Sequence, residues 1–276
     1  MSVKVWGVKT IFEIKNTTFR EALSKKGSIY FNYIDIIFKY PWLCLHNTVL
    51  RLKAKLFNRA IIHVIGDSHL RPFVFRSPFL LHHISQATAY NLDKDNSSSQ
   101  SKKYLNSFLP GINKERDVLL LVFGEIDARV HIYLQYKKNN EQKSIGELIE
   151  ATVDKYGETI KRLKHDGFAV CVHGIPPAAL KTFTSDLPFL GTPEQRSAIS
   201  REFNRKLGDF CRENGILYID VQSISADENG FMRKEYAADE VHLNGKVALF
   251  ARDRIVEAFK GSKNFGRRLK PASAKK

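Results

Sequence analysis

From residue 60 onward, short apolar runs alternate with longer amphipathic stretches, the pattern that β-strands and α-helices leave in a sequence. Strands without a polar face are typical of a parallel sheet that is covered on both sides. We therefore predict an α/β fold with five parallel strands. The apolar runs place these strands at 60–65, about 82–87, 118–123 ("VLLLVF"), 168–173 ("FAVCVH") and 216–221 ("ILYIDV").

Helices are predicted most clearly between the later strands. In the segment 144–167, apolar residues recur every three or four positions, which is the spacing of one helix face. The segment 192–215 opens with Thr192, Pro193 and Gln195, which suit an N-cap, a first turn and a capping box. Both segments end in Gly, the residue that most often follows a helix.

The net charge of +15 belongs to the two ends of the chain. Residues 1–59 contain 11 Lys and Arg against 3 Asp and Glu, residues 260–276 contain 7 against none, and the residues between hold 26 of each sign. We predict a basic, aromatic N-terminal extension (1–59), a neutral domain (60–259) and a basic disordered tail (260–276). Basic arms indicate an anionic partner such as a membrane surface, an acidic polysaccharide or RNA, or they serve solubility alone. Nucleic acid is the least favoured, because no helix-turn-helix, zinc finger or aromatic platform is present.

The N-terminal extension does not read as a membrane span. Asp35, Lys39, Pro41 and His46 interrupt the run of about 20 apolar residues that a spanning helix needs. Residues 28–59 are expected to pack as a helical layer on the domain, or to lie in a membrane interface. The three cysteines are widely spaced and the start lacks a signal-peptide pattern, so we expect a cytoplasmic protein, peripheral to the inner membrane in the second interpretation.

Polar residues follow three of the predicted strands, and the carboxyl ends of parallel strands meet at one edge of a sheet. Ser68 follows the first strand, "GEIDARVH" follows the third, and Asp239 and His242 come after the fifth. A histidine that a carboxylate orients can take the proton of a serine hydroxyl and make it a nucleophile. We predict Ser68 as nucleophile, His242 as base and Asp239 as the acid that orients it, without a metal or other cofactor.

The motifs "VIGDSHLRPF", "LVFGEIDARVHI" and "ADEVHLN" resemble the first, third and fifth blocks of the SGNH/GDSL hydrolase superfamily, over about residues 60–259. The resemblance implies a flavodoxin-like α/β/α sandwich, esterase, lipase or acyltransferase activity, and the same roles for Ser68, His242 and Asp239. Bacterial look-alikes with G-D-S-H and G-E-I-D-x-R-x-H are associated with glycans. An ester-bearing carbohydrate or another acylated small molecule is therefore the expected substrate.

The third block departs from the family pattern G-x-N-D, because Ile126 stands where the family's Asn donates to the oxyanion. Loss of one such donor costs ~10²–10³ in rate. If the segment is extended, Asp127, Arg129 and His131 share one side, and Arg129 could replace the donor or hold an anionic sugar. An ion pair of Arg129 with Glu125 or Asp127 is the structural alternative. The candidates for oxyanion or substrate contacts are Ser85 through its backbone, Thr88, Gly124, Arg129 and His131.

Two other functions stay open from the sequence. Asp67 and His69 mimic the D-x-H ligand pair of calcineurin-like phosphoesterases, with Asp127, His131 and His242 as further metal ligands, although that family's other blocks are absent. A degenerate hydrolase fold that binds a glycan without catalysis is the second alternative. Apart from the metal interpretation, His69 could tune the site next to Ser68, but a surface or packing role is expected.

Overall fold

The computed structural model describes residues 27–180 and 188–260, with side chains from residue 42 onward. The chain divides into two units, Met1–Thr48 and Val49–Lys276, and the boundary falls inside the first described helix, α3 (Gly27–Leu56). Most of the predicted basic tail lies outside the described residues. None of the helices in the described part of the chain is long and apolar enough to cross a membrane.

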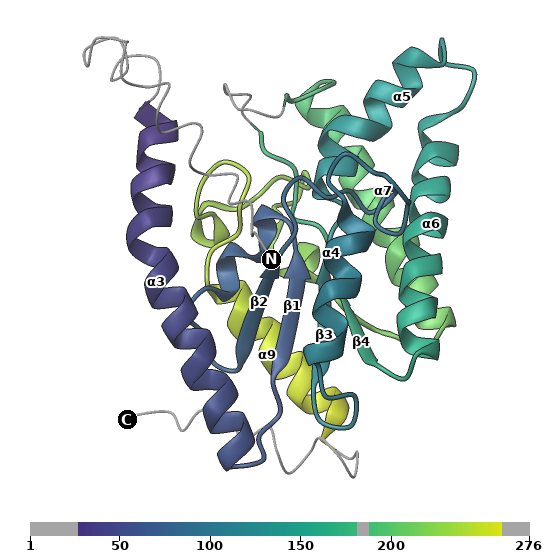
Figure 1. Cartoon of the computed structure of the whole chain (residues 1–276). Helices are drawn as coiled ribbons and strands as arrows, with labels where there is room; N and C mark the ends of the chain where they lie inside the picture. The colour runs from purple at the N-terminus through teal and green to yellow at the C-terminus, as the bar shows by residue number, and fades with distance from the viewer. Residues whose placement is uncertain (1–26, 181–187, 261–276) are drawn as a thin grey trace. The chain divides into compact units, whose positions relative to one another are not determined.

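The second unit contains a five-stranded parallel sheet, which confirms the predicted fold class (Figure 1). The strand order is β2-β1-β3-β4-β5, so that β1 lies between β2 and β3. In the register, Ile62 of β1 pairs with Phe79 of β2 and with Val118 of β3. The strands are β1 (Ile62–Gly66), β2 (Phe79–His83), β3 (Val118–Val122), β4 (Ala169–His173) and β5 (Leu217–Ile219).

Two strand predictions need correction. The second strand is not 82–87 but Phe79–His83, because the chain turns directly after His83, with Gln86 in the left-handed region at φ 52°. The fifth strand stops at Ile219, because the side chain of Asp220 accepts a hydrogen bond from the amide of Ser223 and begins a short helix there. Each difference follows from a local turn or cap that an apolar run does not encode.

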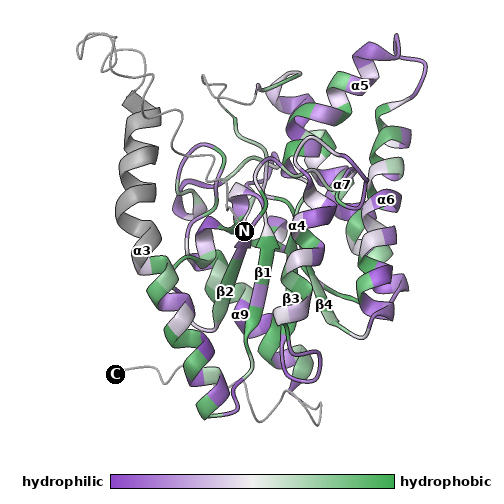
Figure 2. Cartoon of the chain, in the orientation of Figure 1, coloured by the Kyte–Doolittle hydropathy of each residue, from purple (hydrophilic) through white to green (hydrophobic). Residues whose placement is uncertain are grey.

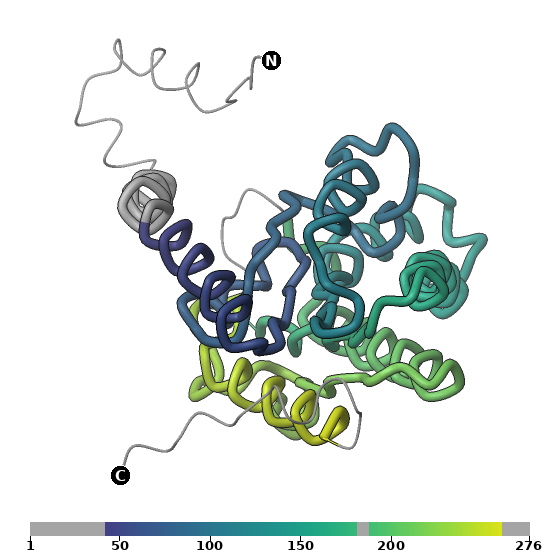
Figure 3. The backbone as a smooth tube through the Cα atoms, turned by 60° about the horizontal axis from the view of Figure 1, so that its bottom comes forward, coloured from purple at the N-terminus to yellow at the C-terminus, as the bar shows by residue number. Residues whose placement is uncertain are grey.

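Helices cover both faces of this sheet and complete three layers (Figures 1 and 3). Side chains of α4, α6 and α7 pack with one set of strand residues, including Ile65 and Leu121. The alternate strand residues, including Val64 and Leu120, pack with α9 and with the 3₁₀ turn after β1. The helices of the second unit are α4 (Ser101–Phe108), α5 (Ile132–Lys138), α6 (Ile145–His165), α7 (Pro193–Glu213), α8 (Val221–Ser225) and α9 (Lys246–Phe259).

The two predicted helices are confirmed as α6 and α7, and both begin with a capping box. Ser144 accepts a hydrogen bond from the amide of Glu147, and Thr192 accepts one from the amide of Gln195. In each case the side chain of the third helical residue returns a bond to the cap, so two otherwise unpaired amides are satisfied. The long helices on this face are therefore fixed at the edge of the sheet where the polar clusters lie.

The last turns of α3 belong to the second unit and pack on its edge. Leu50 and Ala54 are buried in a small cluster with Ile61 and with Leu80 of β2. Because β2 is an edge strand, these contacts cover one side of a strand that has no further neighbour in the sheet. The rest of the surface of these turns is exposed.

Candidate active site

Ser68 lies where β1 changes directly into a 3₁₀ turn, Ser68–Phe73. Gly66 permits this exit, because a Cβ at that position would lie 2.5 Å from the carbonyl oxygen of Val122 on β3. Asp67 caps the turn: its Oδ1 accepts a hydrogen bond of 2.9 Å from the amide of His69. Burial raises the pKa of Asp67 to about 6, against the opposing charge of His69. The nucleophile candidate is thus held by a buried cap and by a close approach of two strands.

Ser68, His242 and Asp239 lie in one chain of contacts, although Ser68 and Asp239 are far apart in sequence. The Oγ atom of Ser68 is 2.9 Å from Nε2 of His242. On the other side of the ring, Nδ1 of His242 is 2.8 Å from Oδ2 of Asp239. The backbone amide of His242 also donates to Oδ1 of Asp239, at 2.8 Å, so the D-x-x-H turn fixes its own geometry.

The electrostatics of this chain keep the carboxylate charged and the imidazole neutral. Burial opposes ionisation of Asp239, but the hydrogen bonds from the side chain and backbone of His242 outweigh it and hold the pKa of Asp239 well below its usual range. Burial lowers the pKa of His242, and the charges of His69 and Arg71 lower it further, against the pull of Asp239. A neutral imidazole that contacts a serine hydroxyl can accept its proton.

Arg71, which the sequence analysis did not single out, also contacts this chain. It lies three residues after Ser68, and its Nη1 donates to Oδ2 of Asp239 at 3.1 Å. The side chains of Arg71 and Asp239 are each nearly half exposed, at 47% and 44%. The edge of the site around the carboxylate is therefore polar and open to solvent.

His69 is buried beside His242, which corrects the expectation that it lies at the surface. Its ring lies 4.7 Å from the ring of His242, centroid to centroid, and its Nε2 lies 3.0 Å from Oε2 of Glu125. Glu125 in turn accepts a hydrogen bond of 2.5 Å from Nε of Arg129. The charged residues of the first and third motifs thus form a buried row, His69–Glu125–Arg129, beside the triad.

Within this row the neighbouring charges favour the protonated form of His69 and the ionised form of Glu125. Burial would neutralise His69, but the carboxylates of Glu125 and Asp67 outweigh it and raise the pKa of the imidazole. Burial likewise opposes ionisation of Glu125, yet His69 and Arg129 lower its pKa to about 2. A positive charge is therefore stabilised on His69, directly against the ring of His242.

Asp127 and Gly124 of the third motif fix the backbone at the edge of the site. Asp127 is buried, and its carboxylate accepts hydrogen bonds from the amides of Ala89 (2.7 Å) and Tyr90 (3.2 Å). Burial raises its pKa to about 7. Gly124 has φ 114°, and a Cβ there would lie 2.7 Å from the ring of Phe203. Ile126 is only 4% exposed and offers no hydrogen-bond donor from its side chain.

The other predicted contact residues have local positions and partners of their own. The expectation that Asp127, Arg129 and His131 share one side is wrong, because Asp127–His131 is a helical turn that leads into α5, and not an extended segment. Arg129 forms the ion pair with Glu125 that was its structural alternative. The Oγ1 atom of Thr88 accepts a hydrogen bond from the side chain of Asn91, at 3.1 Å. Ser85 lies in the exposed turn after β2.

The residues of the metal alternative have other partners. Asp67 caps the turn after β1, Asp127 accepts backbone amides, and His242 contacts Ser68 and Asp239. Among the described residues, no three or more His, Cys, Asp or Glu side chains form a group that could hold a metal ion. The arrangement at the end of β1 favours proton transfer between a serine and a histidine.

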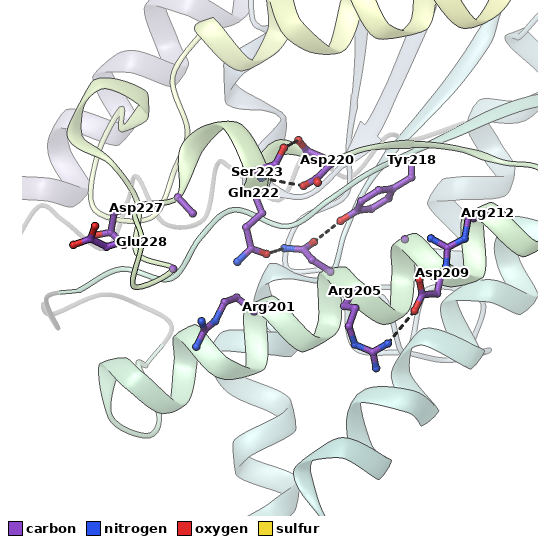
Figure 4. A pocket seen from close by; sticks show the side chains of 14 residues that line it. Arg201, Arg205, Asp209, Arg212, Tyr218, Asp220, Gln222, Ser223, Asp227 and Glu228 are labelled. Carbon is purple, nitrogen blue, oxygen red and sulfur yellow. Dashed lines mark hydrogen bonds and ion pairs between the residues drawn. The ribbon is translucent and has the colours of Figure 1, made fainter.

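A hollow of about 570 Å³ lies away from the triad residues, between α7 and the segment after β5 (Figure 4). Its polar side chains are largely paired with one another. The hydroxyl of Tyr218 donates to Oδ1 of Asn204 at 2.8 Å, and Arg205 binds Asp209 at 2.9 Å (Figure 4). Ser68, His242 and Asp239 are not among the residues that line it.

Comparisons with known proteins place the chain among distant structural neighbours. No family model matches it, and no curated protein matches it in sequence. A GDSL-like lipase from Bacteroides thetaiotaomicron is similar at 14% identity and a TM-score of 0.48, over 73% of this chain and 88% of the other. A catalytic mutant of an acetylxylan esterase from Geobacillus stearothermophilus is similar at 12% identity and a TM-score of 0.42, over 72% and 93% of the two chains.

Phospholipase A1 from Streptomyces albidoflavus is a third such neighbour, at 12% identity and a TM-score of 0.43, over 72% of this chain and 98% of the other.

Proposed function

We propose that the protein is a serine ester hydrolase or acyltransferase, with Ser68 as nucleophile, His242 as general base and Asp239 as the acid that orients it. The observation that carries the proposal is the continuous chain of contacts Ser68–His242–Asp239, with heavy-atom distances of 2.9 and 2.8 Å. Both distances lie within the range that proton transfer requires. A serine that only caps a helix does not need a histidine and a carboxylate in line behind it.

In the proposed reaction, Oγ of Ser68 attacks the carbonyl carbon of the ester while Nε2 of His242 accepts the hydroxyl proton. Collapse of the tetrahedral intermediate breaks the bond to the alcohol, which leaves with the proton from His242, and the acyl group stays on Ser68. Water or a second hydroxyl then attacks the acyl-enzyme, and His242 again takes and returns the proton. Asp239 stabilises the imidazolium at each stage through its bond to Nδ1.

The oxyanion requires donors in place of the missing Asn. The backbone amide of Ser68, at the start of the 3₁₀ turn, is one candidate. His69 is the second, because Glu125 stabilises its positive charge beside the site. Nε2 of His69 faces Glu125, which leaves Nδ1 as the ring nitrogen available to a ligand. We propose that His69, and not Arg129, offsets the loss at Ile126, because Arg129 binds Glu125.

We propose an ester-bearing carbohydrate as the substrate class. The polar, half-exposed side chains of Arg71 and Asp239 beside the triad suit a hydroxyl-rich alcohol better than a fatty-acyl chain, which needs an apolar channel. The named activity of the acetylxylan esterase neighbour agrees with this class, although it describes that protein alone.

The test is hydrolysis of a panel of acetylated mono- and oligosaccharides, compared with a phospholipid and with p-nitrophenyl acetate. We expect release of acetate from one or more of the sugars, and its loss in Ser68→Ala. Ser107→Ala is the matched control, because Ser107 is an exposed serine whose hydroxyl bonds to the carbonyl of Tyr104 in its own helix. Turnover by Ser68→Ala at the wild-type rate would overturn the assignment of the nucleophile.

Binding without turnover is the outcome that would favour the second candidate, a glycan-binding module on a degenerate hydrolase fold. The buried Ile126 is the observation behind it, because a site that lacks one oxyanion donor is slower. Calorimetry with the same sugars separates the two functions: sugar affinity that survives in Ser68→Ala, with no acetate released by the wild type, indicates the binding module.

A further inference from the structure

The end of α3 that belongs to the second unit carries an exposed row of apolar side chains. Val49, Leu52 and Leu56 are 38%, 54% and 75% exposed. Their spacing of three and four residues puts them on one side of the helix, away from the buried pair Leu50 and Ala54. We call these three residues the α3 stripe. Figure 2 shows hydrophobic and hydrophilic positions alternating along this end of the helix.

The apolar surface continues past the end of the helix. Phe57, directly after Leu56, is 65% exposed. An isolated exposed leucine is ordinary, whereas several exposed apolar side chains together on one surface mark an interaction site. The feature to be explained is therefore an apolar row along the last turns of α3 that faces solvent.

Basic residues surround the stripe, and the stretch of sequence around it contains no acidic residue. Arg51, Lys53, Lys55 and Arg59 are all exposed. Between residues 36 and 66 the sequence contains no Asp or Glu. The guanidinium of Arg59 lies 5.6 Å from the ring centre of Phe57, so a positive charge also contacts the aromatic residue at the end of the row. The natural partner of this surface is apolar at its centre and negatively charged around it.

Charge decides between the possible occupants of the stripe. A second copy of the chain would bring the same lysines and arginines against each other, whereas paired helices place opposite charges beside their apolar seam. The two ends of the chain are poor candidates, because residues 1–26 carry six Lys and Arg against two Glu, and residues 261–276 carry six against none. An anionic lipid bilayer provides both an apolar interior and negative headgroups.

We propose that the α3 stripe and its basic neighbours bind the surface of an anionic lipid bilayer, with Leu52 and Leu56 inserted among the headgroups. The helix lies in the plane of the interface and does not cross the membrane. This binding is independent of the ester chemistry at Ser68, because neither set of residues contributes to the other.

The experiment is co-flotation of the full-length protein with vesicles of phosphatidylcholine alone and of phosphatidylcholine mixed with phosphatidylglycerol, across a salt series. We expect strong binding to the mixed vesicles at low salt, weaker binding as salt rises, and little binding to pure phosphatidylcholine. Lys53→Gln and Lys55→Gln should each weaken binding about five-fold, the effect of one basic residue near an anionic surface.

The double variant Leu52→Glu/Leu56→Glu should weaken binding to the mixed vesicles by at least ~10-fold, because it removes apolar insertion and adds negative charge. Leu249→Glu on α9 is the matched control, since Leu249 is another exposed leucine (44%) in the same unit, and its binding should equal that of the wild type. Circular dichroism of all variants verifies that they fold.

Three results would overturn the proposal. In the first, the wild type does not float with mixed vesicles at low salt. In the second, the Leu52→Glu/Leu56→Glu variant floats as well as the wild type, which would assign binding to the basic tail. In the third, sedimentation velocity without lipid shows a dimer that the double variant converts to a monomer, which would assign the stripe to a second copy of the chain.

Discussion

The second unit contains two histidine pairs, and their surroundings explain why only one of them suits catalysis. His63 on β1 and His82 on β2 stack inside the core, with ring centres 5.1 Å apart and Nδ1 of His63 2.8 Å from Nε2 of His82. His69 and His242 pack at 4.7 Å at the edge where the strands end. Both pairs have carboxylate neighbours, since Asp117 contacts His63 and Asp239 contacts His242.

The two pairs differ in what lies opposite the ring nitrogen that does not contact the carboxylate. In the core pair, the nitrogens of His63 are directed at His82 and Asp117, and all three side chains are buried. In the edge pair, Nε2 of His242 faces a serine hydroxyl that is only half buried. Burial lowers the pKa of His82 to about 3, which makes it a structural group, whereas the base of the edge pair keeps a reactive partner. Similar residue types thus serve packing in one place and, in the proposed reaction, proton transfer in another.

The largest expected effect comes from breaking each pair in the same way. His242→Gln should lower kcat/KM for an ester substrate by at least ~10⁴-fold, because the serine loses its base. His82→Gln should leave kcat/KM within a few-fold of the wild type, since Gln keeps an acceptor for His63. The measurement is steady-state hydrolysis of p-nitrophenyl acetate by both variants. A Ser68→Ala/His242→Gln double variant should be no slower than either single one, because the two residues act as a unit.

A smaller effect is expected from the charge on His69. His69→Gln should lower kcat by about 10²-fold, the usual cost of one oxyanion donor. It should also move the acidic limb of the kcat/KM profile to higher pH, because the positive charge that lowers the pKa of His242 is gone. Glu125→Gln should shift the acidic limb in the same direction. Without the carboxylate of Glu125, the pKa of His69 falls and His69 loses the positive charge that lowers the pKa of His242. A kcat loss without any shift of the acidic limb would reduce His69 to a packing residue.

The core pair, His63 and His82, should affect the free energy of unfolding and not the rate of ester hydrolysis. Burial lowers the pKa of His82 from its ordinary value of 6.5 to about 3 in the folded chain, so between these pH values the unfolded chain binds more protons. The free energy of unfolding should therefore fall as pH drops below 6.5, by at most about 1.4 kcal/mol per pH unit for this group. Urea unfolding between pH 7 and 4 measures the slope. His82→Gln should make the free energy of unfolding less dependent on pH, whereas His165→Gln, at an exposed position, should leave the slope as in the wild type. If the two variants show the same slope, the loss of stability at low pH does not come from His82.

The smallest effect is expected at Arg71. Its ion pair with Asp239 is nearly half exposed on both sides, and such pairs contribute at most about 1 kcal/mol. Arg71→Gln should therefore lower kcat/KM less than about five-fold with p-nitrophenyl acetate. A much larger loss with an acetylated sugar than with p-nitrophenyl acetate would show that Arg71 also contacts the alcohol part of the substrate.

The sequence predicted the sheet and the three members of the proposed triad because each carries a strong local signal. The apolar runs at 60–65 and 118–123 lie on β1 and β3, and the D-x-x-H spacing brings Asp239 to His242 within one turn. The edge of a parallel sheet then brings these segments to the end of β1, two residues before Ser68. None of this requires knowledge of side-chain packing.

The row His69–Glu125–Arg129 could not be predicted in the same way, because it depends on contacts between two strands. An ion pair between residues 56 positions apart, His69 and Glu125, leaves no periodic trace in the sequence. The signal that was available is the presence of charged residues directly beside buried strand ends, in "GDSH" and "GEID". The ion pair of Arg129 with Glu125 was anticipated as a structural alternative, whereas the extended segment was wrong, because the chain after β3 is helical and its apolar pattern does not reveal this.

The most direct test of the account is labelling of the full-length protein with a fluorophosphonate, followed by peptide mapping by mass spectrometry. Such a reagent reacts only with a serine that a neighbouring base activates. We expect one adduct, on Ser68, which disappears in Ser68→Ala and is strongly reduced in His242→Gln, while His82→Gln labels like the wild type. A wild-type protein that remains unlabelled at Ser68, or that labels equally well after loss of His242, would contradict the proposal of a serine nucleophile activated by His242.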